Sequence, residues 1–260
     1  MTHVVHAQLV RLARPRALLA ALAAALLFAV VVPAAVILSA GAGPAGGRAP
    51  TLTSLAGPGG GAEAFALGVS FTGLLVLVLV TAVFTGEFSR GTMRVMVMRE
   101  PRRLRLLGGT MAAMLGVAAA LLAVTAALAW AGSAAIAPGR GVPIGDWLTA
   151  EALGEDLAAY GRALAVVCCW ALIGMALGVS LRVTPLALAA GVAWFGPFEH
   201  IVADSWGGGE RWFPGLLLEA AAAGGTDAVP LARALPLGAA YALAAATVAA
   251  ALLRRRDVTA

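Results

Sequence analysis

The chain has 260 residues, of which 61% are hydrophobic and only 12% are charged. A water-soluble domain carries about twice that charged fraction, so water is not the main solvent of this fold. All 18 basic residues are arginines, and they gather at the ends of apolar blocks instead of forming a stripe with aromatic residues between them. This distribution excludes the groove of a nucleic-acid-binding protein, and we expect no nucleic-acid partner.

Apolar segments long enough to cross a bilayer, which takes about 20 residues, recur six times along the chain. They lie at roughly 17–40, 66–85, 107–131, 163–181, 184–203 and 232–253. The first is longer than the apolar part of a cleaved signal peptide, which indicates a retained span. The predicted fold is an all-α integral membrane protein, with six transmembrane helices in a single domain covering residues 1–260.

The residues before the first span form a candidate helix at the membrane surface. In the segment 3–16, Val5, Leu9 and Leu12 fall on one helical face, while the arginines point elsewhere. We therefore predict an interfacial helix over residues 1–16. The connection after the first span, 41–65, is rich in glycine and proline, and we expect little regular structure there.

The arginines predict the direction in which the chain crosses the membrane. If the N-terminus is cytoplasmic, 13 of the 18 arginines but only three of the 13 acidic residues are cytoplasmic. Those arginines are Arg11, Arg14, Arg16, Arg90, Arg94, Arg99, Arg102, Arg103, Arg105, Arg182, Arg254, Arg255 and Arg256. This is the positive-inside bias of membrane proteins, and we expect both termini in the cytoplasm.

The connection between the second and third spans, 86–106, is the most distinctive part of the chain. Arg90 and Arg94 are one helical turn apart, which places them on one face if the segment is helical, and Glu87 is close enough to pair with Arg90. Pro101 ends the helix before the basic pair Arg102 and Arg103. The segment fits a contact with another protein, and equally an anchor that touches only lipid head groups.

Methionines add an adaptable apolar surface to this connection. Met93, Met96 and Met98 fall within eleven residues of Glu87, and methionine is common at surfaces that bind partners. We therefore expect these three side chains to be available to a partner.

Two connections on the opposite side are less informative. The residues 138–160 include acidic and aromatic side chains and predict a short amphipathic helix on the membrane surface. The outer loop 204–231 mixes tryptophans with glycines and is expected to dip into the interface. Glu199 and His200, at the end of the fifth span, fit either a binding pair or a solvated rim, and we favour the rim.

Several kinds of chemistry are missing from the sequence. The interior of the spans is expected to hold no ionisable side chain, which argues against an ion-driven secondary transporter. The chain has no lysine and therefore no P-loop for ATP hydrolysis. Cys168 and Cys169 are neighbours without further metal ligands, and we interpret them as packing residues. We expect no cofactor, no metal and no catalytic residue in this chain.

Small residues in the fourth span predict close helix packing. Gly174 and Gly178 form a GxxxG pattern, whose spacing lets two helices approach closely. In a chain this rich in glycine and alanine, we interpret the pattern as packing within one subunit.

Three sequence patterns together resemble a known family. The second span ends in Glu87-Phe88-x-x-Gly91-Thr92-x-Arg94, followed by Pro101-Arg102-Arg103, which is similar to the motif E-(F/Y)-x-x-G-T-x-R…P-R-R. Leu177-Gly178-Val179-Ser180-Leu181-Arg182 resembles an L-G-x-x-x-R turn, and the chain closes with Arg255-Arg256-Asp257-Val258. These features look like the permease subunit of a bacterial ATP-binding-cassette (ABC) transporter of the type-2, exporter-like class. One departure is Gly108-Gly109, where relatives often have Gly-Lys.

The resemblance implies a mechanism. Two permease subunits, identical or related, would pair in the bacterial cytoplasmic membrane and dock onto cytoplasmic ATPase subunits, while 1–16 would be an interfacial elbow helix. The connection 86–106 would be the coupling loop, and the substrate would be hydrophobic or amphipathic. The residues expected to contact the ATPase are Glu87, Phe88, Arg90, Gly91, Thr92, Arg94, Pro101, Arg102 and Arg103. The alternatives are a stand-alone secondary transporter or channel, and a membrane scaffold that transports nothing.

Overall fold

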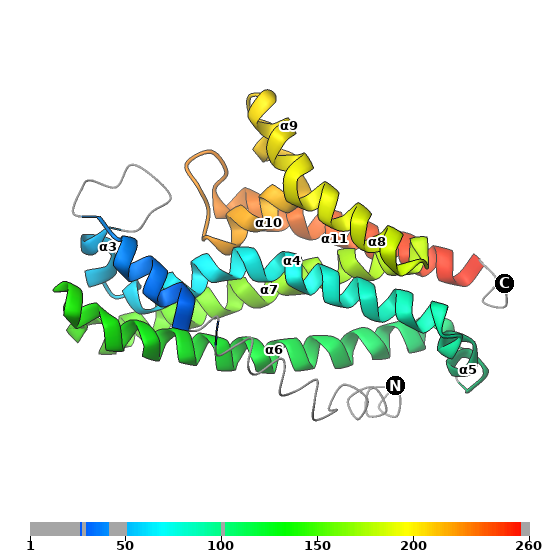
Figure 1. Ribbon diagram of the computed structural model, residues 1–260, viewed down its shortest axis with the longest axis horizontal. Coiled ribbons are helices and arrows are strands. Elements are labelled where there is room, and N and C mark those ends of the chain that lie inside the picture. Colours follow the sequence, from blue (N-terminus) through cyan, green and yellow to red (C-terminus); the bar gives the residue numbers. More distant parts are fainter. Residues whose placement is uncertain (1–26, 28–29, 42–50, 100–101, 256–260) are drawn as a thin grey trace. The chain divides into compact units, whose positions relative to one another are not determined.

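A computed structural model describes residues 27, 30–41, 51–99 and 102–255 (Figure 1). The regular secondary structure of these residues is helical. After an apolar helix at Val30–Ser39, the elements are α3 (Leu52–Ala56), α4 (Gly60–Ser89), α5 (Thr92–Arg99), α6 (Arg103–Ile136), η1 (Ala137–Arg140), η2 (Gly145–Leu148), α7 (Ala150–Leu181), α8 (Thr184–Ala193), η3 (Trp194–Phe198), α9 (Glu199–Ser205), η4 (Gly209–Arg211), α10 (Pro214–Ala222) and α11 (Leu231–Arg255). The predicted interfacial helix 1–16, half of the first span, Pro101 and the residues 256–258 lie outside the described residues.

Five helical stretches of the described chain are long and apolar enough to cross a membrane. They are Thr72–Ser89, Arg103–Arg140, Ala150–Leu181, Thr184–Ser205 and Leu231–Arg255. Each overlaps one of the last five predicted spans. Of the first predicted span, only Val30–Ser39 is described as a helix, and it has ten residues. The prediction of an all-α protein with several membrane-spanning helices is therefore confirmed at this coarser level.

The chain groups into two compact units. Among the described residues, one unit combines 70–99 and 102–117 with 165–255, and the other combines 27, 30–41 and 51–69 with 118–164. The three long helices α4, α6 and α7 contribute residues to both units. The predicted coupling segment belongs to the first unit, which is therefore described first.

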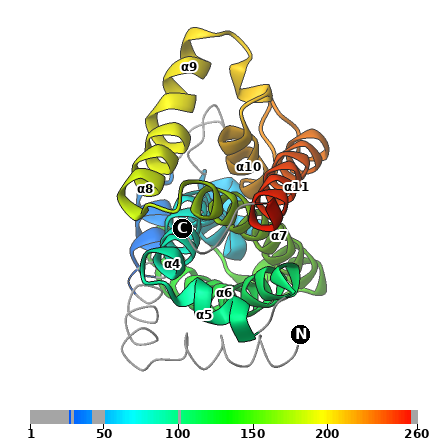
Figure 2. The same cartoon turned by 90° about the vertical axis from the view of Figure 1, so that its right-hand side faces the viewer.

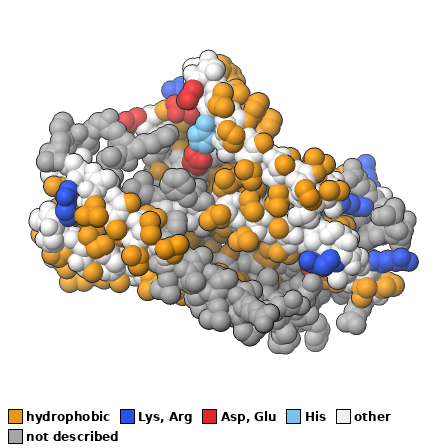
Figure 3. Space-filling model, in the orientation of Figure 1, with side chains coloured by type: hydrophobic (Ala, Val, Ile, Leu, Met, Phe, Trp, Pro, Cys, Tyr) orange, Lys and Arg blue, Asp and Glu red, His pale blue; other side chains and the backbone are white. Residues whose placement is uncertain are grey.

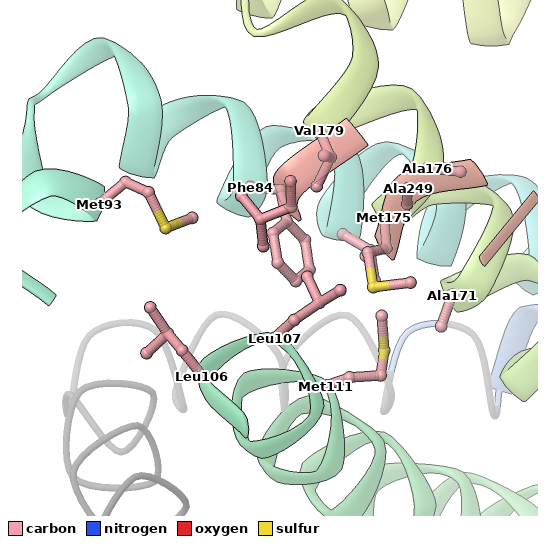
Figure 4. Packing of buried hydrophobic residues seen from close by; sticks show 12 residues of the cluster. Phe84, Met93, Leu106, Leu107, Met111, Ala171, Met175, Ala176, Val179 and Ala249 are labelled. Carbon is pink, nitrogen blue, oxygen red and sulfur yellow. The ribbon is translucent and has the colours of Figure 1, made fainter. Parts of the chain in front are cut away.

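The core of the first unit is an apolar cluster built from α4, α5, α6, α7 and α11. Phe84 of α4 is its largest fully buried member, and Figure 4 shows its ring between Val179 of α7 and Leu107 of α6. Ala249 and Leu253 of α11 complete the cluster, with no more than 1% of their surface exposed. Because lipid is as apolar as these side chains, their contribution is close van der Waals packing between helices.

Two glycines let α7 approach α4 closely. A Cβ atom added to Gly174 would lie 2.8 Å from the Leu77 carbonyl oxygen, and one added to Gly178 would lie 2.7 Å from the Phe84 Cβ. The buried Thr81 hydroxyl donates a hydrogen bond to the Gly174 carbonyl oxygen at 3.0 Å. The GxxxG pattern therefore lies where α7 and α4 approach each other.

Positive φ angles mark two chain reversals in this unit. Gly91, at φ +66°, separates α4 from α5, and glycine adopts this conformation without a steric penalty. Arg182, at φ +57°, separates α7 from α8, where a side chain carries a penalty of about 1–2 kcal/mol. Pro185, in the first turn of α8, lacks an N–H that would have no partner inside the helix.

The segment α8 to α9 carries an apolar surface. Its exposed side chains include Leu186 (55% exposed), Trp194 (46%) and Ile201 (64%), and Figure 3 shows hydrophobic side chains over the visible surface of this segment. The π-helix η3, which contains Pro197, joins α8 to α9. Such a surface is suited to contact with lipid, because covering apolar side chains with lipid removes no polar group from water.

The second unit has a core of its own. Val36 and Ile37 pack with Leu55, Ala137 and Trp147. The Trp147 Nε1–H donates to the Leu55 carbonyl oxygen at 2.8 Å, so the indole contributes a hydrogen bond as well as apolar area.

The predictions for three connections need correction. The connection 41–65 is partly helical, because a reciprocal cap between Thr51 and Ser54 starts α3, and α4 already begins at Gly60. Residues 150–160 are no separate surface helix but the first turns of α7, which begins beside the Thr149 hydroxyl that accepts from the Ala152 N–H. The loop 204–231 contains the buried helix α10, which lies alongside α11 (Figures 1 and 2).

Candidate functional site

The predicted coupling segment forms a short helix, α5, at the ends of α4 and α6 (Figures 1 and 2). One face of α5 packs onto the core cluster: Met93 is buried, and Met96 and Val97 are partly buried against it. The other face exposes Arg94, Val95 and Met98. The helix therefore presents a basic and apolar surface to its surroundings while its inner face contacts the core.

The prediction for the methionines is therefore wrong for two of the three. Met93 is 4% exposed and Met96 is partly buried, whereas Met98 is 69% exposed. The reason is the helical periodicity. Residues that are three positions apart in a helix lie close to one face, and this face of α5 packs on the core cluster. Only Met98 is open to a partner.

The two arginines at the centre of the prediction are both exposed, but they do not share a helix. Arg90 follows the last residue of α4, and Arg94 lies in α5, because Gly91 reverses the chain between them. The prediction that they lie on one helical face is wrong. Arg90 turns back along α4, since a Cβ atom added to Gly86 would lie 2.8 Å from its Nη2 atom.

Glu87 and Thr92 connect the end of α4 to the start of α5. Glu87 is 3% exposed, and its carboxylate accepts a hydrogen bond from the Thr92 hydroxyl. The same hydroxyl approaches the Glu87 carbonyl oxygen at 3.1 Å. A buried carboxylate is stabilised by such donors. Glu87 therefore positions α5 from inside and does not offer its charge to a partner.

Phe88 and Arg182 connect the same place to the turn between α7 and α8. The Arg182 guanidinium carbon lies 4.9 Å from the centre of the Phe88 ring, within the range of a cation–π interaction. Phe88 also packs against the core cluster. Sequence reasoning placed Phe88 in the coupling motif and Arg182 in a separate turn motif. Only the fold brings the two together.

Arg103 connects the start of α6 to the end of α11. Its Nη1 donates a hydrogen bond to the Leu253 carbonyl oxygen at 3.0 Å. The last carbonyl groups of a helix have no partner within the helix, and a cation there also favours the helix dipole. Of the predicted contact residues, Gly91 and Arg102 are exposed like Arg90 and Arg94, while Arg103 is partly buried.

Replacing Arg103 by alanine is expected to loosen the last turn of α11. Losing a hydrogen bond from a charged, partly exposed donor costs about 1 kcal/mol, which corresponds to roughly fivefold faster local opening. Hydrogen–deuterium exchange of peptides covering 249–255 measures this change. The matched control is Arg105→Ala, which removes an exposed arginine of the same helix. Equal exchange in both variants would contradict the assignment.

Three contacts link the neighbourhood of α5 to other helices. Thr92 of α5 contacts Glu87 of α4, while the flanking Phe88 of α4 contacts Arg182 and the flanking Arg103 of α6 contacts Leu253 of α11. Among the described residues, no group of three or more His, Cys, Asp or Glu side chains is placed to hold a metal ion.

A buried acidic residue was misjudged from the sequence. Glu199 has no exposed surface and lies inside the candidate span Thr184–Ser205, so the prediction of a solvated rim is wrong. Glycines and tryptophans nearby suggested an exposed loop, and the sequence gives no sign of α10 folding over the carboxylate.

Comparisons with protein-family models, with characterised proteins and with solved structures give no match for this chain. The basis for a function is therefore the chain's own residues. In the part of the chain that the structure describes, five helical stretches are long and apolar enough to cross a membrane, and the short helix α5 lies between two of them.

Proposed function

We propose that this chain is the membrane-spanning permease subunit of a bacterial ABC transporter of the type-2, exporter-like class. It pairs with a second permease subunit in the cytoplasmic membrane, with both termini in the cytoplasm. A separate ATP-binding-cassette subunit hydrolyses ATP and pushes on α5. The substrate is a hydrophobic or amphipathic compound that crosses between the two permease copies.

The geometry of α5 carries this proposal. A helix of eight residues lies between two candidate spans, exposes Arg94 and Met98, and is attached on its inner side to the core cluster. Such a helix can receive force from a soluble partner and pass it to the spans, because packed helices move as rigid elements. A lipid anchor would need only the exposed arginines and not the attachments through Glu87, Phe88 and Arg103.

The charge distribution supports the proposed orientation. The exposed arginines Arg90, Arg94, Arg102 and Arg105 are close together in sequence around α5, as expected for a cytoplasmic loop under the positive-inside rule. A basic surface also complements an acidic docking site on a partner and increases the rate of association.

The buried Glu199 favours a second candidate, a transporter driven by an ion gradient. Ionisable side chains within spans mark proton and ion pathways in such proteins. This candidate needs no ATPase partner, and the same experiment therefore separates the two.

Recovery of a soluble P-loop ATPase with the tagged full-length protein is the expected result of gentle extraction from its native membranes. Arg94→Glu is expected to reduce the recovered ATPase at least about tenfold, since opposing like charges at an interface cost several kcal/mol. The matched control is Arg211→Glu, which reverses another exposed arginine in η4 and should leave recovery unchanged.

Each other outcome contradicts a stated part of the proposal. Equal recovery with Arg94→Glu would show that α5 is not the docking helix. Absence of any ATPase with the wild-type protein, while other membrane complexes remain intact, would favour the ion-driven transporter or a scaffold. Loss of ATPase in both variants would indicate a general charge effect without a specific site.

A further inference from the structure

Glu199 occupies an unusual place at the junction of α9 and α10. Its carboxyl group has no exposed surface, and its Oε2 accepts a hydrogen bond from the Leu216 N–H at 3.2 Å. The Gly215 N–H and the Trp194 indole also interact with the carboxylate. Gly215 and Leu216 belong to the first turn of α10, whose N–H groups have no partners within the helix. Glu199 therefore caps α10 from a different helix.

The cap replaces one that the local sequence does not provide. The residue before α10, Phe213, makes no side-chain hydrogen bond to the helix, and Pro214 has no N–H. A carboxylate at this end of a helix also gains from the helix dipole. The start of α10 thus depends on a residue that precedes it by 15 positions.

The other carboxylate oxygen has no such partner. Oε1 is buried and makes no hydrogen bond to the described residues. An ionised oxygen in this position loses its hydration without compensation, which favours the neutral acid. The donors of α10 favour the anion at Oε2. Because the two effects oppose each other at one carboxyl group, both its charged and its neutral forms are accessible.

A second carboxylate and a histidine lie beside this group. His200 Nδ1 is 2.6 Å from the Gly196 carbonyl oxygen, which can only accept, so Nδ1 carries a hydrogen. Nε2 lies 3.3 Å from Glu219 Oε2, and a hydrogen bond between these two atoms requires a proton on one of them. The His200 side chain is 43% exposed and that of Glu219 is 30% exposed. This partly exposed pair includes the sequence neighbour of Glu199.

We propose that Glu199 is a proton-binding site whose charge controls how firmly the first turn of α10 is held. A proton taken from the solvent forms an O–H bond at Oε1 and removes the negative charge. Oε2 then becomes a weaker acceptor, since hydrogen bonds to an ionised group are roughly twice as strong as neutral ones. The first turn of α10 is expected to open more often when Glu199 is neutral. The inference does not rest on the proposed function, and it holds whether ATP or an ion gradient drives transport.

Other charged groups lie around this site. Glu219 of α10 lies beside His200, with its Oε2 3.3 Å from the His200 Nε2. Arg233 of α11 lies over the Trp212 ring at 5.1 Å. The remaining charged or titratable groups on α9, η4 and α11 are His200, Asp204, Glu210, Arg211, Tyr241, Arg254 and Arg255. Variants of Glu219 and His200 must therefore accompany those of Glu199.

The test is hydrogen–deuterium exchange of the full-length protein in lipid nanodiscs over a pH series. The exchange rate of peptides covering 215–219 is divided, at each pH, by the known exchange rate of free amides at that pH. In the wild-type protein, protection should fall in a single step, about tenfold, as the pH is lowered. Glu199→Gln should show low protection at every pH and no step. Glu151→Gln, at an exposed glutamate of α7, should behave as the wild type.

The variants of the neighbouring groups decide the assignment. Glu219→Gln and His200→Gln should each keep the step, shifted along the pH axis, because they alter the surroundings of Glu199 but not the titrating group. Loss of the step in either variant would overturn the proposal by assigning the titration elsewhere. A wild-type protein without any step would overturn it as well, even if Glu199→Gln failed to fold.

Discussion

Replacing Gly178 by leucine is expected to lower the thermal unfolding temperature by roughly 3–10 °C, or to prevent folding. A Cβ atom at this position would lie 2.7 Å from the Phe84 Cβ and 3.1 Å from the Thr81 carbonyl oxygen. These atoms belong to or adjoin the backbone of α4 and cannot rotate away. The two helices must therefore separate, which costs about 1–3 kcal/mol and disturbs the cluster around Phe84.

Gly161→Leu is the matched control for this experiment. Gly161 lies in the same helix, α7, and a Cβ atom there would meet nothing within 4 Å. Leucine favours the helix over glycine by up to about 0.8 kcal/mol, so the control should unfold at the same or a slightly higher temperature. Thermal unfolding of the detergent-solubilised protein measures both variants. Equal temperatures for Gly178→Leu and the wild type would contradict the close approach of α4 and α7.

Thr92→Val is expected to release α5 from the end of α4. The substitution keeps the shape of the side chain but removes the hydroxyl that donates to the buried Glu87 carboxylate. Leaving a buried acceptor with one donor fewer costs about 1–3 kcal/mol. Trypsin cleavage after the exposed Arg90 and Arg94 measures the opening, and it should become roughly tenfold faster. Thr247→Val, at an exposed threonine that bonds only within α11, should leave cleavage unchanged.

A double-mutant cycle assigns this effect to the pair of residues. Glu87→Leu also destabilises the segment, since it removes a buried polar group that has a partner. The double variant Glu87→Leu with Thr92→Val should be less destabilised than the sum of the single changes, by about 1–2 kcal/mol. Strict additivity would mean that the hydroxyl and the carboxylate do not act on each other. The cleavage assay serves for all three variants.

Much of the fold was predictable because it depends on the order of apolar and polar residues. Five of the six predicted spans coincide with helices long and apolar enough to cross a membrane, since a run of about 20 apolar residues has few other stable conformations in a bilayer. The sequence also predicted a close helix contact at Gly174 and Gly178, although not that α4 is the partner. Gly174 and Gly178 have no side chains, and their spacing of four places both on one helix face.

The segment around α5 was predicted in place but not in detail. Its position between two spans and the exposure of Arg94 follow from hydropathy and charge. Hydropathy and charge do not predict which methionines face the core. Helical periodicity places Met93 and Met96 near one face of α5, but it does not say whether that face packs on this protein or on a partner. The break at Gly91, which separates Arg90 from Arg94, depends on a backbone conformation that glycine permits but does not require.

Hydropathy and charge along the chain are enough to predict an all-helical protein with several membrane-spanning segments, the place of a basic connection and a close helix contact. These features depend on neighbours in the chain. The burial of Glu87 and Glu199, the contact of Arg182 with Phe88 and that of Arg103 with Leu253 depend on the three-dimensional fold. Each of these polar groups interacts with a residue of another helix. The physical reason is that a buried charge depends on the three-dimensional position of its donors, which hydropathy does not record.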